Sequence, residues 1–169
     1  CGDSTNAEDV AGLMAGARVD AVITDPPYGV NYERSLEERG GQAAVHAPYH
    51  ESNGADVLAF LGLVPADVVV MSFPVDRHFF DLARAVKDAG FELRKELVWV
   101  KDTFSFWPGA AYQQRHEPIL VLARPGKPLN ADVPANESTV FEIPRPVAHD
   151  LHPTAKPLEL WEKLVRYHT

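Results

Sequence analysis

The sequence has 169 residues, the length of one domain, and its content of 46% hydrophobic and 24% charged residues is ordinary for a globular protein. Its single cysteine excludes an internal disulfide framework and any four-thiolate zinc site. No apolar run approaches the ~20 residues of a membrane span, and the N-terminus has no signal-peptide pattern. We therefore expect an intracellular, cytoplasmic protein that forms one domain over residues 1–169.

The net charge of −8 argues against a broad basic clamp for nucleic acid. The charge is uneven, because residues 1–62 carry ten acids and three bases, whereas residues 63–169 carry fourteen and thirteen. A site can be locally basic on an acidic protein. The second half of the chain is thus where a nucleic-acid contact is expected.

The first predicted helix begins at Thr5, because Glu8 stands three residues later in the spacing of a capping box. Its apolar positions recur on one face, at Val10, Leu13, Met14 and Ala17. An apolar strand at 21–24 follows and ends in the run Asp-Pro-Pro-Tyr at 25–28, since two prolines cannot continue a central strand. The polar stretch 30–54 is predicted to be a long loop, and such loops in compact domains tend to be functional.

Helices and strands then alternate along the chain. The patterns predict a short helix near 55–62, a buried strand at 68–71, a helix near 76–89 that ends at Gly90, strands at 97–100 and 119–122 joined by a loop at 102–116, an edge strand near 138–143, and a last helix that begins with Pro157. Strands that are apolar on both faces and alternate with helices predict an α/β fold. Its sheet is expected to be mainly parallel, with helices on both faces.

The run at 25–28 carries the strongest chemical signal. In open α/β sheets ligands bind beyond the carboxyl ends of the strands, which is where Asp25 emerges. Asp25 and the Pro26 carbonyl can accept hydrogen bonds from an amino group, Pro27 stiffens the turn, and Tyr28 offers its ring for stacking. A strand-end turn without chemistry is the alternative, because these residue types are common in turns.

These residues resemble the DPPY-type S-adenosylmethionine-dependent DNA amino-methyltransferases, and among them the β class, whose catalytic motif precedes the cofactor motif. Three further segments are similar to family motifs in the same order: Trp99-Val100-Lys101 to W-x-K, the run YQQRHEPIL at 112–120 to Y-x-x-x-H-E-x-I-L, and the run HPTAKP at 152–157 to H-P-T-x-K-P. The family's glycine loop should follow, but the sequence stops at Thr169. We therefore expect a fold that is incomplete at its C-terminus, which argues against cofactor binding and activity by this chain alone.

The resemblance implies a Rossmann-like methyltransferase fold, S-adenosyl-L-methionine as cofactor and double-stranded DNA as substrate. Asp25, Pro26, Pro27 and Tyr28 would then be catalytic, acting on the exocyclic N6 amine of an adenine that has left the duplex. Aspartate at the first motif position favours adenine over the N4 amine of cytosine. Methylation of cytosine N4 stays open, and so does a catalytically inactive α/β module that binds nucleic acid or a partner.

The resemblance also implies further binding residues. The cofactor set comprises Asp3, Asp25, His152, Thr154 and Lys156. Thr154 and Lys156 precede a helix whose N-terminus favours an anion such as the cofactor carboxylate. Asp3 serves equally well as a carboxylate at the start of the first helix.

The predicted nucleic-acid contacts are Lys101, Arg115 and His116, beside the loop at 102–116, although a structural role is an equal alternative for each. Residues 125–151 would form a short target-recognition region, and 30–54 an active-site loop. The aromatic residues Phe104, Phe106, Trp107 and Tyr112 form either a stacking surface or the packing under the loop. No metal is expected, because the loop histidines, His46, His50, His149 and His152, lack ligand spacing.

The resemblance finally points to a bacterial, archaeal or phage source and to restriction–modification as the setting. Such enzymes commonly form homodimers, and no residue pattern in the sequence marks an interface.

Overall fold

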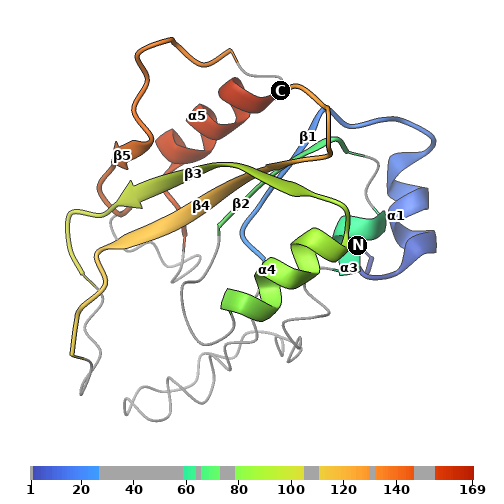
Figure 1. Cartoon of the computed structure of the whole chain (residues 1–169), viewed down its shortest axis with the longest axis horizontal. Helices are drawn as coiled ribbons and strands as arrows, with labels where there is room; N and C mark the ends of the chain where they lie inside the picture. The colour runs from blue at the N-terminus through green and yellow to red at the C-terminus, as the bar shows by residue number, and fades with distance from the viewer. Residues whose placement is uncertain are drawn as a thin grey trace.

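A computed structural model describes residues 2–26, 59–63, 66–72, 79–104, 111–129, 132–146 and 155–169. Its elements in chain order are α1 (Ala7–Met14), β1 (Ala21–Thr24), α3 (Ala59–Leu63), β2 (Val68–Ser72), α4 (Phe79–Asp88), β3 (Glu92–Val100), β4 (His116–Ala123), β5 (Val140–Glu142) and α5 (Leu158–His168). The five strands form one sheet with helices on either side (Figure 1).

The sheet has the strand order β1-β2-β4-β3-β5 and is mixed. β1 runs parallel to β2, and β3 runs parallel to β5, but β4 is antiparallel to both of its neighbours, β2 and β3. Four strands, β1, β2, β3 and β5, therefore run in one direction and only β4 is reversed, so the prediction of a mainly parallel sheet is supported in part. Strands β2 and β4 are apolar on both faces because helices cover both faces, and that burial does not depend on strand direction.

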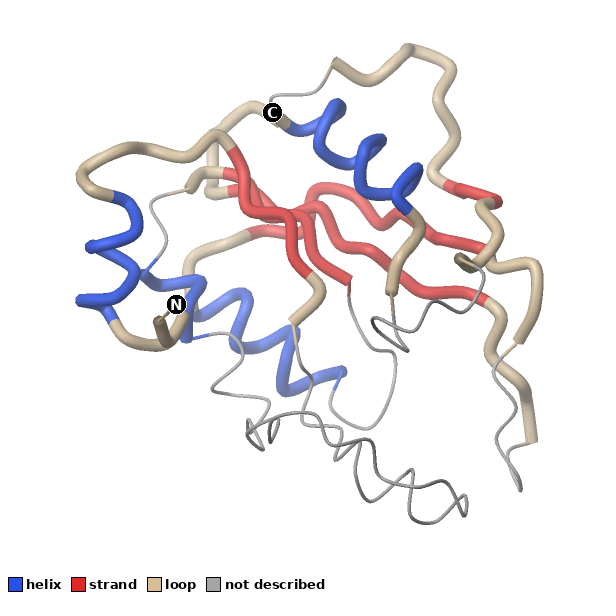
Figure 2. The backbone as a smooth tube through the Cα atoms, turned by 180° about the vertical axis from the view of Figure 1, so that it is seen from behind, coloured by secondary structure: helices blue, strands red, loops and turns tan. Residues whose placement is uncertain are grey.

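Alternate residues of β2 face two separate cores, as the two-residue period of a strand requires. Val68 and Val70 belong to a core that is covered by α5, whereas Val69 and Met71 belong to one that is covered by α3 and α4. Figures 1 and 2 show the same layering from opposite sides, with α5 on one face of the sheet and α3 and α4 on the other. The prediction of helices on both faces is confirmed.

The predicted strands and helices are found largely where the sequence patterns place them. β1 has the predicted bounds, β5 is an edge strand among the described strands, and Gly90 follows α4 with a positive φ of 83°. β3 begins five residues earlier than predicted, at Glu92. Its first half is exposed and charged, so apolarity alone could not mark its start.

The first helix corrects two expectations. Its N-cap is Asn6, whose side chain accepts hydrogen bonds from the backbone N–H groups of Glu8 and Asp9, while Thr5 donates to the Asp3 carboxylate instead. The capping box predicted at Thr5 is therefore wrong. α1, which the structure describes in full, buries none of its residues, and Leu13 is 85% exposed.

α5 supplies three residues of the pocket described below, and both apolar packing and polar contacts hold it on the sheet. Leu160, Leu164 and Tyr167 pack into the core under it. The Glu137 carboxylate accepts a hydrogen bond from the Tyr167 hydroxyl at 2.5 Å and pairs with Lys163 at 3.0 Å. The helix begins at Leu158 with Pro157 as its N-cap, one residue later than predicted. In the described part of the chain, no helix is long and apolar enough to cross a membrane.

Candidate active site

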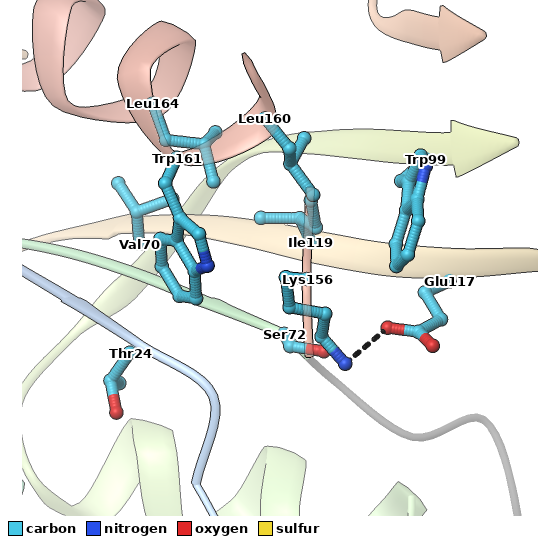
Figure 3. A pocket seen from close by; sticks show the side chains of 10 residues that line it. All are labelled: Thr24, Val70, Ser72, Trp99, Glu117, Ile119, Lys156, Leu160, Trp161 and Leu164. Atoms are coloured by element: carbon cyan, nitrogen blue, oxygen red, sulfur yellow. Dashed lines mark ion pairs between the residues drawn. The ribbon is translucent and has the colours of Figure 1, made fainter. Parts of the chain in front are cut away.

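A small pocket lies where β1 and β2 end, between the sheet and α5 (Figure 3). Thr24 is the last residue of β1 and Ser72 the last of β2, and both line the pocket. Leu160, Trp161 and Leu164 reach it from α5 and form an apolar wall. Since β1 and β2 are parallel, their carboxyl ends meet at one edge, which is where α/β sheets bind ligands.

Four charged side chains of alternating sign lie in a row beside this pocket. The Lys101 ammonium contacts one oxygen of Glu117 at 2.5 Å, and the other oxygen of Glu117 contacts Lys156 at 2.8 Å. Lys156 in turn contacts Oδ2 of Asp25 at 3.0 Å. These residues come from the ends of β3, β4 and β1 and from the segment before α5. We call this row the charge chain, and its formal charges sum to zero.

Trp99 forms the floor of the charge chain. Its side chain is 2% exposed, and its indole N–H donates to the Ile143 carbonyl at 2.7 Å. The ammonium groups of Lys101 and Lys156 lie 5.0 and 5.8 Å from the centre of its ring, within the range of cation–π attraction. The buried Trp99 ring thus makes cation–π contacts with both lysines of the charge chain.

The ion pairs determine the protonation of the two central groups. Burial by itself would raise the pKa of the Glu117 carboxyl, but Lys156 and Lys101 outweigh it and hold that pKa below 4.5. Burial would likewise lower the pKa of the Lys156 ammonium, but Glu117 and then Asp25 raise it above 10.5. Glu117 is therefore an anion and Lys156 a cation at neutral pH.

Asp25 ends the charge chain and is the member that faces outward most. It follows β1 directly, its side chain is 31% exposed, and the next residue, Pro26, is buried. Oδ2 takes part in the ion pair with Lys156, and among the described residues no ion pair engages Oδ1, the second acceptor oxygen of the carboxylate. The arrangement presents a fixed hydrogen-bond acceptor to a donor such as an amino group.

A family model described as DNA methylase, for N6 and N4 methyltransferases, matches residues 19–169. The chain belongs to this DNA methylase family. The family transfers methyl groups from S-adenosylmethionine, and its substrate is DNA. A comparison with curated proteins found no significant match.

Two solved structures are similar to this methylase fold. The crystal structure of the M1.HpyAVI–SAM complex aligns with a TM-score of 0.61 at 22% sequence identity, over 96% of this chain and 73% of that one. The crystal structure of M1.HpyAVI aligns with a TM-score of 0.60 at 21% identity, over 96% of this chain and 72% of that one. These likenesses show a methyltransferase Rossmann-like fold.

The structure brings two of the predicted site residues, Asp25 and Lys156, into direct contact across 131 positions of sequence. It places Lys101 in the charge chain, where its side chain is only 11% exposed. Arg115 and His116 are exposed at the start of β4. Asp3 lies before α1, where its carboxylate accepts hydrogen bonds from the Thr5 N–H and hydroxyl groups.

Several predictions fall outside the described residues. They concern Pro27, Tyr28, His152, Thr154, the loop at 30–54, the aromatic residues Phe106 and Trp107, and the four loop histidines. The other two aromatic residues beside the loop at 102–116 are exposed, Phe104 by 53% and Tyr112 by 92%. Among the residues that the structure describes, no group of three His, Cys, Asp or Glu side chains could hold a metal ion.

Sequence reasoning did not assign roles to Glu117 or Trp161. Glu117 joins the two lysines, and Trp161 lines the pocket from α5. Glu117 was visible as the acidic residue of the H-E segment, and its position opposite Trp99 follows once β3 and β4 are paired. Trp161 gives no comparable signal, because an aromatic residue in an amphipathic helix indicates core packing first.

Proposed function

We propose that this methylase transfers a methyl group to the exocyclic N6 amine of adenine in double-stranded DNA. The observation that supports the proposal is the Asp25 carboxylate, which stands at the carboxyl end of β1 with one oxygen fixed by Lys156. The Asp-Pro-Pro-Tyr run that begins at Asp25 resembles that of the β class, in which aspartate favours adenine. The same resemblance supports a cytoplasmic setting in a bacterial, archaeal or phage context.

Asp25 acts on the amine in this mechanism. Oδ1 accepts a hydrogen bond from the amine, which raises electron density on the nitrogen and orients its lone pair. The Pro26 carbonyl is a second acceptor. The target base must leave the duplex to reach these groups, as for other enzymes that modify bases. Lys156 keeps Asp25 in one orientation, so little entropy is lost when the amine binds.

The chain's residues fit a methyl donor that combines charged groups with an apolar body. Thr24 and Ser72 offer hydroxyls at the strand ends, Trp161 offers an aromatic face, and Asp25 and Lys156 offer charges of both signs. S-adenosylmethionine supplies the electrophilic methyl group when it is bound. Lys156 and Asp25 are the described members of the proposed cofactor set, together with Asp3.

Asp25→Asn tests the assignment. The change keeps the shape of the side chain and removes its charge, so we expect methyl transfer to fall by a factor of roughly 10²–10⁴, the usual contribution of a group that assists proton transfer. The thermal midpoint should change little, because the Asp25 side chain is partly exposed. The measurement is nucleoside mass spectrometry of DNA incubated with S-adenosylmethionine and with either this chain or the chain extended past Thr169, since activity of this chain alone is not expected.

Asp20→Asn is the matched control, since Asp20 is an exposed aspartate at the opposite end of β1. It should retain wild-type transfer. If the product is N4-methylcytosine, the target base is cytosine and the assignment of adenine is wrong. An Asp25→Asn variant with undiminished transfer would remove Asp25 from the mechanism, and a wild-type chain that methylates neither base would favour an inactive binding module.

A further inference from the structure

Glu117 is the most connected member of the charge chain. Each of its carboxylate oxygens contacts a different lysine, at 2.5 Å for Lys101 and 2.8 Å for Lys156. The side chain is 26% exposed, and both lysines are more buried than it is. Glu117 comes from β4, where it is paired with Trp99 of the neighbouring strand β3.

Lys156 is shared between two carboxylates, and this sharing has a consequence for Asp25. The ammonium lies 2.8 Å from Glu117 and 3.0 Å from Asp25. If Glu117 lost its charge, the positive charge of Lys156 would be balanced by Asp25 alone. The ammonium could then move toward Asp25 and engage both of its oxygens, which would compete with a donor on the substrate.

Lys101 also helps to keep Glu117 charged, because it contacts the Glu117 oxygen that does not contact Lys156. It neutralises the charge that Glu117 does not share with Lys156, so the pair can stay buried beside Trp99. Among the described residues, the charged groups that face Lys156 are Glu117 on β4 and Asp25 after β1, with Lys101 behind Glu117.

Building on the proposed function, we propose that Glu117 is a positioning residue for methyl transfer: it holds Lys156 at a distance that fixes Oδ2 of Asp25 and leaves Oδ1 for the amine of the target base. Glu117 does not touch the reacting atoms in this role. It acts through Lys156, and because this role requires no contact with DNA, its loss should change kcat and leave KM for DNA nearly unchanged.

The test compares Glu117→Gln with Asp67→Asn. Asp67 is a close match, because it also bridges two cations, Arg18 at 3.1 Å and Lys127 at 3.0 Å, and its side chain is 27% exposed. It precedes β2, whereas the pocket lies at the other end of that strand, roughly 17 Å away at about 3.3 Å per residue. Both variants remove a carboxylate from a bridge, but only one bridge reaches Asp25.

Two readouts are measured for both variants. Steady-state transfer to DNA gives kcat and KM from pH 7 to 11, and nuclear magnetic resonance of chain labelled at lysine follows the titration of Lys156. We expect Glu117→Gln to lower kcat by about 10–100-fold, in line with a small misplacement of a catalytic group, with KM for DNA within about twofold. Because Glu117 raises the pKa of Lys156, its loss should move that titration and the alkaline limb of kcat to lower pH together.

Asp67→Asn should change neither kcat nor the alkaline limb. The inference is overturned if Glu117→Gln keeps both at wild-type values, if both variants lose activity equally, or if only KM changes. A wild-type chain without transfer would refute the proposed function instead. In that case an unchanged Lys156 titration in Glu117→Gln would refute control of Lys156 by Glu117 as well.

Discussion

Trp99 joins the stability of the fold to the order of the site. Its ring is buried, lies within cation–π range of two ammonium groups, and donates to the Ile143 carbonyl beyond β5. That hydrogen bond adds to the three-residue ladder between β3 and the edge strand. A single side chain therefore serves the core, the edge of the sheet and the charge chain.

Trp99→Phe should destabilise the protein by about 1–3 kcal/mol, because the Ile143 carbonyl loses its buried donor. The phenyl ring still offers a weaker face to the two lysines. Urea unfolding at neutral pH measures the loss. Trp161→Phe serves as the comparison, since Trp161 is only half-buried, and an equal loss in the two variants would contradict the role given to the indole N–H.

Asp25 and Glu117 differ in how far sequence could predict them. Asp25 sits in a local run after an apolar strand, so its place at a strand end was predictable, and its chemistry stays a prediction. Glu117 acts through partners 16 and 39 positions away, Lys101 and Lys156. Its role depends on distances that only the folded chain defines.

At the scale of the element, α5 sets the position of Lys156. The helix is anchored through Glu137, whose pKa is lowered by the hydrogen bond from Tyr167 and by Lys163. Its last turn carries His168, which is 4% exposed and whose Nδ1 lies 2.9 Å from the Leu164 carbonyl. The helix is thus fixed by a partly buried polar cluster of Glu137, Lys163 and Tyr167 and by a buried imidazole at its end.

His168 should make the protein sensitive to mild acid. Burial lowers the pKa of this imidazole below 6.5, although its contact with Leu164 opposes the shift. The imidazole therefore binds a proton near pH 6.5 in the unfolded chain but not in the folded one. The free energy of unfolding consequently falls as the pH drops through this range. The thermal midpoint should fall less between pH 7.5 and 5.5 in His168→Gln than in the wild type.

The control for this prediction is His116→Gln, because His116 is exposed at the start of β4. It should retain the wild-type fall in thermal midpoint. If His168→Gln shows the same fall as well, the buried imidazole is not the cause of the acid sensitivity.

For the whole molecule, sequence patterns predicted the α/β class, the layering, most elements and the common direction of four strands, but not the reversal of β4. Hydrophobic runs report burial, and β2 and β4 are buried whichever way their neighbours run. The loop at 102–116 was no guide either, because its length suits a crossover as well as a return along the same edge. The antiparallel setting of β4 is what brings Glu117 next to Trp99.

The acidic charge of the molecule bears on how it meets DNA. With a net charge of −8, binding should depend on a few local cations and so have a shallow salt dependence. Arg115 is exposed beside β4, whereas Lys101 is largely buried and forms an ion pair with Glu117. The structure thus separates two residues that the sequence grouped together.

Arg115→Ala should weaken binding to all DNA sequences alike and lower the slope of log K against log salt by about 0.9, the value for one phosphate contact. Fluorescence anisotropy at several salt concentrations measures the slope. Arg84→Ala, an exposed arginine on α4, should leave it unchanged. An identical slope in wild type and Arg115→Ala would exclude a phosphate contact at this position.

One carboxylate shared by two lysines also constrains how the sequence can drift. A substitution at Lys101 removes one of the two ion pairs of Glu117 and so changes the ion pair between Glu117 and Lys156. Which residues are tolerated at each position therefore depends on the residues present at the other two. The three positions are epistatic, and homologues should replace them as a set or not at all. Variation at any one of them would then be informative about the other two, even in relatives too distant for the pocket itself to be aligned.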